Sequence, residues 1–278
     1  MSKAKPLKGF YKNMKNEDYH NDDTHYSSTT LKKALKGSTY FYDYVVTKSK
    51  VEDMPQAALD LGNYLHIALL EPELLESQTE IFPMQTRGAK TFSSFVLENE
   101  GKTVITMGEL QTAEEIINSF NTDSIDIGED APLMCSRIFK NGYAEESLFT
   151  ELDGLPIKVR FDYAIYKEGR IVIRDLKTTS SQANTTQDAD YICLRYGYYI
   201  SAALYVDALR TYLSKLGYAP ATIIDFELVF ASKSDYNINM FRISEETLEK
   251  GRKQYKAAIA LIKMWKEKGN YSEGLRKL

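Results

Sequence analysis

The stretch Gly169–Thr179, GRIVIRDLKTT, decides the fold of this 278-residue chain. Its β-branched residues predict a strand, and the end of that strand carries Asp175 and Lys177 on either side of Leu176. Alternate side chains of a strand share a face, so Asp175 and Lys177 should point the same way while Leu176 packs behind them. An acid that binds a cation and a lysine that serves an attacking water suit metal-dependent phosphate chemistry.

The strand that precedes this stretch supplies a second aspartate. The segment Lys158–Tyr163, KVRFDY, carries Asp162, and a turn at Lys167–Gly169 predicts that the two strands form a hairpin. Asp162 can then meet Asp175, and the two carboxylates can hold a hard divalent cation such as Mg2+. The alternative is a salt-bridged hairpin without chemistry, and the hairpin pattern alone does not decide between them.

A histidine on a predicted helix favours the functional alternative. Leu59–Leu70 has the apolar periodicity of an amphipathic helix, and Pro72 follows its end. Gly62 and His66 fall on one face beside the apolar stripe. A lone helical histidine is more often structural than a ligand. A glycine inside a helix, however, costs about 1 kcal/mol against alanine and usually has a packing or close-approach reason. We therefore predict that this face is functional.

The segment Leu59–Glu73, with the pattern LDLGxxxHxxxLEPE, resembles the histidine motif of the RecE-type exonucleases (exodeoxyribonuclease VIII), a branch of the PD-(D/E)xK nuclease superfamily. The likeness extends from about Tyr19 to the penultimate helix, and its motifs occur in the family's order. The other similar segments are Tyr19–His20, Ser27–Leu31, Gly101–Thr106, Ala144–Ser147, Arg160-x-Asp162 and Asp175–Thr179.

This resemblance implies an α/β fold with a PD-(D/E)xK nuclease core, in which helices flank a central mixed β-sheet. Residues 27–278 would form one nuclease domain with an N-terminal helical part, after a polar segment at residues 1–26. The implied activity is Mg2+-dependent exonucleolytic degradation of linear double-stranded DNA from the 5′ end. The product would be a 3′ single strand for an annealing protein or recombinase, in phage or prophage recombination.

The resemblance also implies which residues act. Glu145 would be a metal ligand or a carboxylate that supports the ligands, with Glu146 the less favoured choice. We expect Mn2+ to substitute for Mg2+, because an imidazole nitrogen suits later first-row ions. The expected catalytic residues are Asp162, Asp175, Lys177 and Glu145, and the expected metal ligands are His66, Asp162, Asp175 and the Leu176 carbonyl.

One position departs from the family's pattern. RecE-type enzymes carry Gln-x-x-x-Tyr on the helix after the lysine strand, whereas this chain has Ser201 and Tyr205. Residues four apart share a helix face, so both should still point towards the site, with Tyr198 one turn earlier. We expect Tyr205 to belong to the catalytic set, and Tyr198 and Ser201 to contact DNA. Ordinary helix packing is the alternative for each tyrosine.

The net charge of −4 argues mildly against a general nucleic-acid coat. A local basic lining remains possible in the sequence, because Lys158 and Arg160 share the strand face of Asp162 and are our other DNA-binding candidates. The two cysteines, Cys135 and Cys193, are too few for a disulfide framework or a four-cysteine iron–sulfur cluster.

The sequence shows no apolar run of membrane-spanning length and no signal peptide, so we expect a cytoplasmic protein without a membrane partner. A homo-oligomer, a tetrameric ring by preference, follows from the resemblance. Two other functions stay open: a defence or restriction endonuclease on the same fold, and a DNA-binding protein with an impaired site.

Periodicity places the remaining elements. Ser27–Thr30 should cap a short helix from Leu31, and residues 1–26 should be irregular. The other predicted helices are 108–121, 189–216 and 245–268, and the predicted strands are 147–152, 157–165, 170–176, 222–231 and 237–243.

Overall fold

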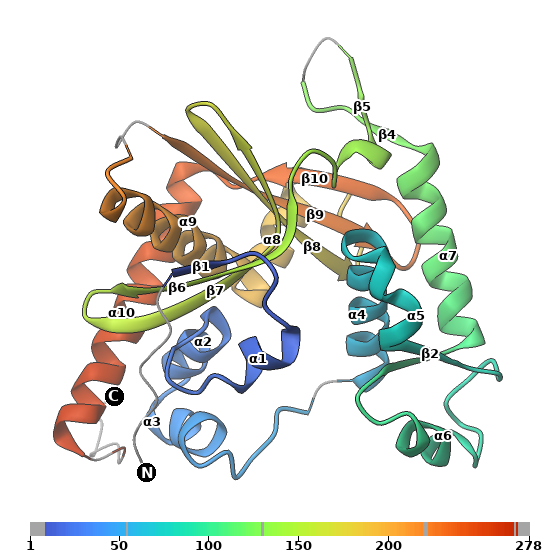
Figure 1. Ribbon diagram of the computed structural model, residues 1–278, viewed down its shortest axis with the longest axis horizontal. Coiled ribbons are helices and arrows are strands. Elements are labelled where there is room, and N and C mark those ends of the chain that lie inside the picture. The colour runs from blue at the N-terminus through green and yellow to red at the C-terminus, as the bar shows by residue number, and fades with distance from the viewer. Residues whose placement is uncertain (1–8, 54, 129–130, 219–221, 270, 272–278) are drawn as a thin grey trace.

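A six-stranded mixed sheet, in the order β1-β6-β7-β8-β9-β10, forms the centre of the computed structural model, which describes residues 9–53, 55–128, 131–218, 222–269 and 271 (Figure 1). All neighbours pair antiparallel except β8 and β9, which run parallel. The expected α/β architecture with a mixed sheet is therefore confirmed. The strands are β1 Gly9–Tyr11, β6 Tyr143–Leu152, β7 Leu155–Lys167, β8 Arg170–Thr179, β9 Ile223–Ser232 and β10 Ile238–Arg242.

Helices cover both faces of this sheet, and the sequence of β9 shows why. Its even-numbered residues, such as Phe226 and Phe230, lie in a core cluster with α2, α9 and α10. Its odd-numbered residues Val229 and Ala231 lie in a second cluster with α4 and α7. A strand segment buried on both faces is apolar without interruption, and the run Leu228–Ala231 of β9 has this composition. These helices are α2 Ser28–Leu35, α4 Gln56–Leu70, α7 Met107–Thr122, α9 Tyr198–Lys215 and α10 Glu245–Lys268.

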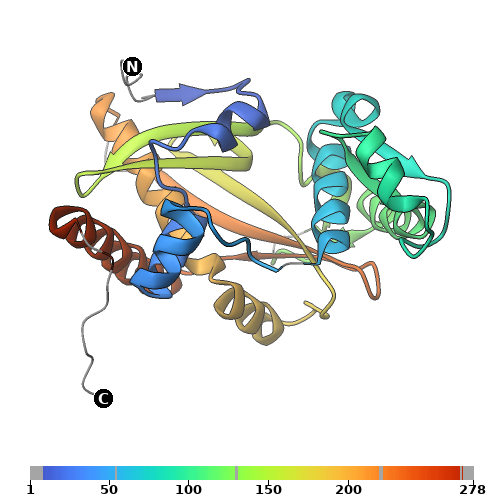
Figure 2. The ribbon, with the colours of Figure 1, turned by 90° about the horizontal axis from the view of Figure 1, so that it is seen from below.

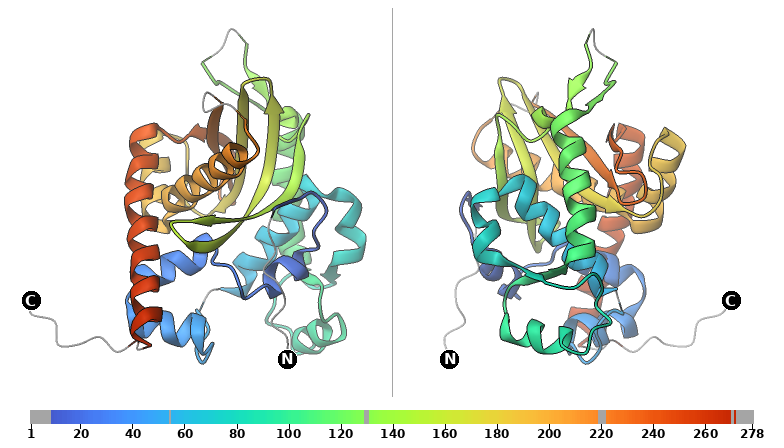
Figure 3. Two further views of the ribbon diagram at one scale, coloured as in Figure 1. Left: turned by 60° about the vertical axis from the view of Figure 1, so that its left-hand side comes forward. Right: turned by 90° about the vertical axis from the view of Figure 1, so that its right-hand side faces the viewer.

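The two layers of helices lie on opposite flanks of the molecule. Figure 2 shows α2, α9 and α10 with the sheet on one side, and α4 to α7 as a compact group on the other. In Figure 3, the left view shows α10 along one side of the molecule, and the right view shows α7 in front of the sheet. The smaller elements are α1 Asn16–Asn21, α3 Ser38–Phe41, a π-helix at Tyr42–Val46, a 3-10 turn at Pro72–Leu74, α5 Leu75–Gln78, β2 Thr79–Phe82, α6 Phe92–Glu98, β3 Thr103–Thr106, β4 Ser124–Ile125, β5 Leu133–Met134, a 3-10 turn at Cys135–Arg137 and α8 Thr186–Tyr196.

Most predicted elements form, and their ends follow local signals. The Ser27 side chain accepts a hydrogen bond from Thr30 N and caps α2, although the helix begins three residues earlier than predicted. The last helix has the predicted bounds, with Ser244 as its cap. Within the described residues, no helix combines the length and the apolar character needed to cross a bilayer.

Two predictions about local structure are wrong. The single helix predicted over 189–216 is two helices, α8 and α9, because Gly197 between them adopts a left-handed conformation with φ 66°. The N-terminal segment is not irregular throughout: residues 9–11 add the edge strand β1 to β6, and α1 follows. Residues 1–8 lie outside the described part of the chain.

Candidate functional site

The candidate site lies where β7 and β8 separate. The two strands pair from Lys167 and Arg170 back to Tyr163 and Arg174, and no further bridge between them follows in the described residues. Asp162 is the next residue of β7, and its Oδ2 accepts a hydrogen bond from Leu176 N at 2.8 Å. A side-chain carboxylate thus takes the place of a strand partner for β8. The carbonyl of Leu176 is left free for other side chains.

The backbone is distorted at this point. On β6, Glu145 lies between the paired residues Ala144 and Glu146 but has no register partner of its own on β7 among the described residues, and its φ is 53°, in the left-handed region. On β7, Phe161 packs in the α9 cluster, whereas Tyr163, two residues on, packs in a different cluster beneath α4. The side-chain alternation therefore changes phase at Asp162. A non-glycine residue in this conformation costs about 1–3 kcal/mol and persists where its surroundings fix it, often at functional sites.

Helix α4 brings His66 over the gap between the strands. Its neighbour Leu65 is fully buried in the cluster that also contains Leu176, so the helix packs directly on β8. His66 Nε2 lies 3.1 Å from the Leu176 carbonyl oxygen and 3.7 Å from Asp162 Oδ2. Its Nδ1 lies 3.9 Å from Glu145 Oε1. The motif helix predicted from the sequence thus reaches the carboxylates of the hairpin.

Three of these side chains could hold a metal ion. His66, Glu145 and Asp162 each offer one ligand atom, and these atoms lie within 4.8 Å of one another. One imidazole nitrogen and two carboxylate oxygens form a donor set that suits Mn2+ and Mg2+, and the Leu176 carbonyl can add an oxygen. The residues present therefore fit a divalent cation. Sequence reasoning left Glu145 and Glu146 open, and only Glu145 joins this group, because the buried Glu146 accepts a hydrogen bond from Tyr166 instead.

Asp175 and Lys177 form a pair beside the metal-ligand group. Lys177 Nζ lies 2.6 Å from Asp175 Oδ2, 3.7 Å from Asp162 Oδ2 and 3.1 Å from the Leu176 carbonyl oxygen. The two side chains share a face of β8, and Leu176 is fully buried on the other, as the strand periodicity predicts. Asp175 is not one of the three grouped ligands, so in this arrangement its carboxylate serves the lysine.

Burial and charge shift the pKa values of this pair. Burial, with a contribution from the Asp162 charge, raises the pKa of Asp175 to about 6 although Lys177 opposes the shift. Burial alone would lower the pKa of Lys177, but the Asp175 and Asp162 carboxylates outweigh it and raise that pKa above its usual value. Lys177 therefore carries its proton at neutral pH. It can act as a fixed positive charge.

The histidine and the glutamate also influence each other. Burial alone would lower the pKa of His66, but the charge of Asp162 and the nearby Glu145 carboxylate raise it. For Glu145, burial opposes ionisation, while His66 and Arg160 outweigh it and lower the pKa. Arg160 Nε donates to Glu145 Oε2 at 2.5 Å. Arg160 is therefore engaged in positioning a candidate ligand, rather than free for DNA as we expected.

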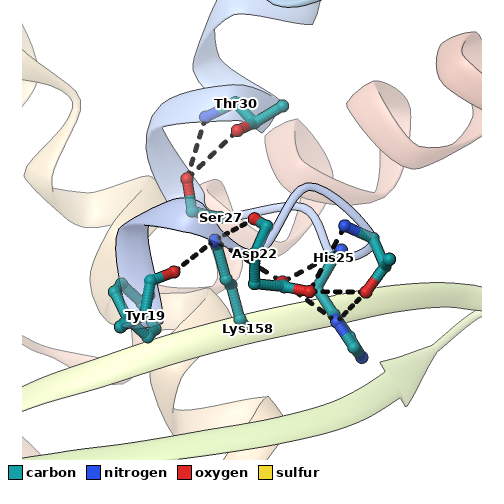
Figure 4. A network of polar contacts seen from close by, with 7 residues as sticks. Tyr19, Asp22, His25, Ser27, Thr30 and Lys158 are labelled. Atoms are coloured by element: carbon teal, nitrogen blue, oxygen red, sulfur yellow. Dashed lines mark hydrogen bonds and ion pairs between the residues drawn. The ribbon is translucent and has the colours of Figure 1, made fainter. Parts of the chain in front are cut away.

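The structure does not support the expected contact between Lys158 and DNA. Its side chain is buried, and its Nζ donates to the carbonyl oxygens of Tyr19 and Asp22 (Figure 4). The Asp22 carboxylate lies 3.5 Å from Nζ and also contacts His25. Lys158 thus fixes the N-terminal segment to β7. In this structure it cannot reach a phosphate, so we withdraw it as a DNA contact.

Helix α9 carries the tyrosines near the site. The Tyr198 ring centre lies 5.6 Å from Lys177 Nζ. The pKa of Tyr205 is raised chiefly by burial and then by the charges of Asp175 and Asp162. Its ring packs edge-on against Phe161, which agrees with the alternative of ordinary helix packing. Its place in the catalytic set stays a prediction. Ser201 is buried one turn before it.

Sequence reasoning missed Lys32 and misread Gly62. Lys32 on α2 lies with its Nζ 3.5 Å from the Tyr196 carbonyl oxygen. Burial and the positive charge of Lys177 lower its pKa to about 8, although the charge of Asp175 opposes the shift. No local signal in the sequence distinguishes Lys32 from its neighbour Lys33. A Cβ at Gly62 would lie 3.6 Å from Thr178 Oγ1, which is ordinary contact. Close approach therefore does not require this glycine.

Comparisons with known proteins agree with this geometry. Residues 27–274 match the family described as "PDDEXK-like domain of unknown function (DUF3799)". The crystal structure of a "Putative exonuclease" from Eubacterium rectale is similar over 94% of this chain and 88% of that one, with a TM-score of 0.62 and 18% identity. At that identity the likeness shows the fold alone. A second solved structure, SSO0001, aligns with 14% identity and a TM-score of 0.25 over 82% of this chain and 84% of that one, and carries no argument. No curated protein matches.

Proposed function

This chain belongs to the PDDEXK-like domain family, and on that premise we propose that it is a divalent-metal-dependent exonuclease acting on linear double-stranded DNA. The observation that carries the proposal is the convergence of His66, Glu145 and Asp162 next to the Asp175–Lys177 pair. A nitrogen and carboxylate donor set beside a half-buried, protonated lysine suits hydrolysis of a phosphodiester.

Each group has a role that its environment supports. His66, Glu145 and Asp162 would hold the cation, which when bound acts as a Lewis acid on the phosphate and lowers the pKa of water. Lys177, protonated and held by Asp175, would stabilise negative charge that develops on the phosphate oxygens. Arg160 holds Glu145 in place. The raised pKa of Lys177 favours charge stabilisation by this side chain over removal of a proton from water.

The finer parts of the proposal rest on the RecE-type motifs. They are cleavage from the 5′ end, a 3′ single-stranded product passed to an annealing protein or recombinase, and a phage or prophage setting. Mg2+ as the natural cation with Mn2+ as a substitute, a cytoplasmic location and a ring-shaped homo-oligomer belong to the same proposal. The ordered motifs support these parts, whereas the name of the Eubacterium rectale protein, "Putative exonuclease", bears on the exonuclease activity alone.

The test uses three DNA substrates with purified protein and Mg2+. They are linear duplex labelled at the 5′ end, the same duplex labelled at the 3′ end, and covalently closed circular duplex. We expect early release of 5′-labelled mononucleotide, late release of the 3′ label and an intact circle. Cutting of the circle would favour a defence or restriction endonuclease. Binding without cleavage of any substrate would favour an impaired DNA-binding protein, for which Ser201 in place of glutamine is the supporting feature.

A matched variant makes the result specific to the site. Asp162→Asn keeps the volume of the side chain and removes one candidate ligand. Any cleavage that survives in this variant at the wild-type rate comes from a contaminating nuclease, or from a site other than the one proposed.

A further inference from the structure

Helix α8 displays large side chains to solvent. Tyr191, Leu194 and Tyr196 are 60%, 56% and 52% exposed. The opposite side of the helix, with Ile192 and Cys193, is buried in the main core cluster and holds the helix in place. Figure 2 shows α8 projecting at the lower edge of the molecule. The exposed tyrosines are therefore not needed to anchor the helix.

An arginine lies between the two exposed rings. The guanidinium carbon of Arg195 lies 6.0 Å from the centre of the Tyr191 ring and 5.6 Å from that of Tyr196. One of its nitrogens lies 3.3 Å from the Tyr191 hydroxyl. Asp188 on the same helix does not compete for this charge, since its carboxylate caps the helix by bonding to Thr185. Aromatic faces next to a cation are the elements with which proteins bind single-stranded nucleic acid.

This surface is continuous with the candidate active site. The Tyr196 ring stacks on Tyr198, with ring centres 5.7 Å apart and planes inclined by 22°. Tyr198 in turn lies 5.6 Å from Lys177 Nζ. The left-handed Gly197 turns the chain between the two rings, and Lys32 Nζ lies 3.5 Å from the Tyr196 carbonyl oxygen. A row of rings and positive charges thus leads from the edge of the molecule to the catalytic lysine.

We propose that Tyr191, Arg195 and Tyr196, here called the α8 platform, bind the unpaired bases of a DNA strand whose phosphate lies at the site. The inference rests on the proposed nuclease function and adds to it that the bound end of the DNA substrate is single-stranded. Bases inside a duplex hide their faces in the stack, so only unpaired bases can lie on these rings. The enzyme would therefore hold a short single-stranded end next to Lys177, separated from its complement.

Binding without turnover tests the platform independently of cleavage. Fluorescence anisotropy in EDTA would compare a short thymidine oligonucleotide with an abasic oligonucleotide of the same length and charge. The wild type should bind the thymidine strand about tenfold or more tightly, because stacking on an aromatic side chain contributes substantially per base. The double variant Tyr191→Ala/Tyr196→Ala should lose most of that preference and bind both strands alike.

Two control variants limit the interpretation. Tyr191→Phe/Tyr196→Phe keeps the aromatic faces and should keep most of the preference. Leu194→Ala removes an exposed apolar side chain from the same helix and should leave the preference unchanged. Light scattering of each variant would show whether the face is instead a contact between copies of this chain.

Three results would overturn the platform. They are an unchanged preference in the alanine double variant, an equal loss in Leu194→Ala, and a change of oligomeric mass in the double variant with base preference intact. Failure of the nuclease proposal would look different, because it would appear as cleavage by Asp162→Asn or as no cleavage by the wild type. Neither of those results alters the binding comparison in EDTA.

Discussion

His66 offers the sharpest test of the site, because its two possible roles have opposite dependences on pH. In the metal-free protein, Asp162 and Glu145 raise the pKa of His66 above its ordinary value of 6.5. A cation can use the imidazole only after displacing this proton. Below the raised pKa, metal affinity should therefore fall by about tenfold per pH unit for the one proton displaced.

The stability of the metal-free protein should change in the other direction. A histidine whose pKa is raised on folding contributes stability that is fully present below the unfolded value of 6.5, and that is lost as the pH rises through the folded pKa. The wild type should thus gain most over His66→Ala at pH 5.5 to 6.5 and less at pH 8.5. Melting curves in EDTA measure this difference.

Calorimetric titration with Mn2+ at half-unit steps between pH 5.5 and 8.5 measures the metal side. We expect His66→Ala to bind Mn2+ at least tenfold more weakly at pH 8. Below the His66 pKa, the slope of its log affinity against pH should be smaller than that of the wild type by about one. Glu145→Gln is the matched control, because it removes a ligand charge but keeps the imidazole, and so should retain a pH-dependent histidine step. The same Mn2+ affinity and the same pH slope in His66→Ala would refute the reasoning. A lower melting temperature at every pH with an unchanged metal requirement would identify a purely structural histidine.

Four further predictions concern the rest of the molecule. Asp162→Asn and Asp175→Asn should each lower the cleavage rate by orders of magnitude with a native circular-dichroism spectrum, and near-normal cleavage by either would contradict the proposed roles. Ser201→Ala should lower the cleavage rate by less than tenfold, about 1.4 kcal/mol, and Tyr205→Ala should lower it more. If the single-turnover rate of Ser201→Ala is as low as that of Asp175→Asn, the serine hydroxyl takes part directly in cleavage. Lys158→Met should lower the free energy of unfolding in urea by about 3–5 kcal/mol, because it leaves the Asp22 carboxylate and two carbonyl groups without their cation. Weaker DNA binding with an unchanged free energy of unfolding would argue against this anchoring role. Light scattering should give a homo-oligomer, a tetramer by preference, and a monomer combined with highly processive digestion would speak against the ring.

Much of the catalytic hairpin was predictable because its information is local. The two-residue period of a strand placed Asp175 and Lys177 on one face, with Leu176 buried on the other. The N-terminal ends of α2 and α10 are fixed by Ser27 and Ser244, whose side chains each accept a hydrogen bond from the backbone N–H three residues later. The order of motifs, read as a family resemblance, led to the PDDEXK-like fold. It also identified the helix whose histidine now lies beside Asp162.

The tertiary structure alone decided which charges reach the site. Periodicity predicted that Lys158 and Arg160 line the site beside Asp162, but the N-terminal segment covers the first and Glu145 engages the second. Lys32 comes to the site from α2, far away in the sequence, and nothing in its sequence neighbourhood distinguishes it from Lys33, which lies beside Glu52 instead. Periodicity reports which way a side chain points from its own element. It cannot report which distant segment packs against that side chain, and burial, pairing and pKa all depend on that packing.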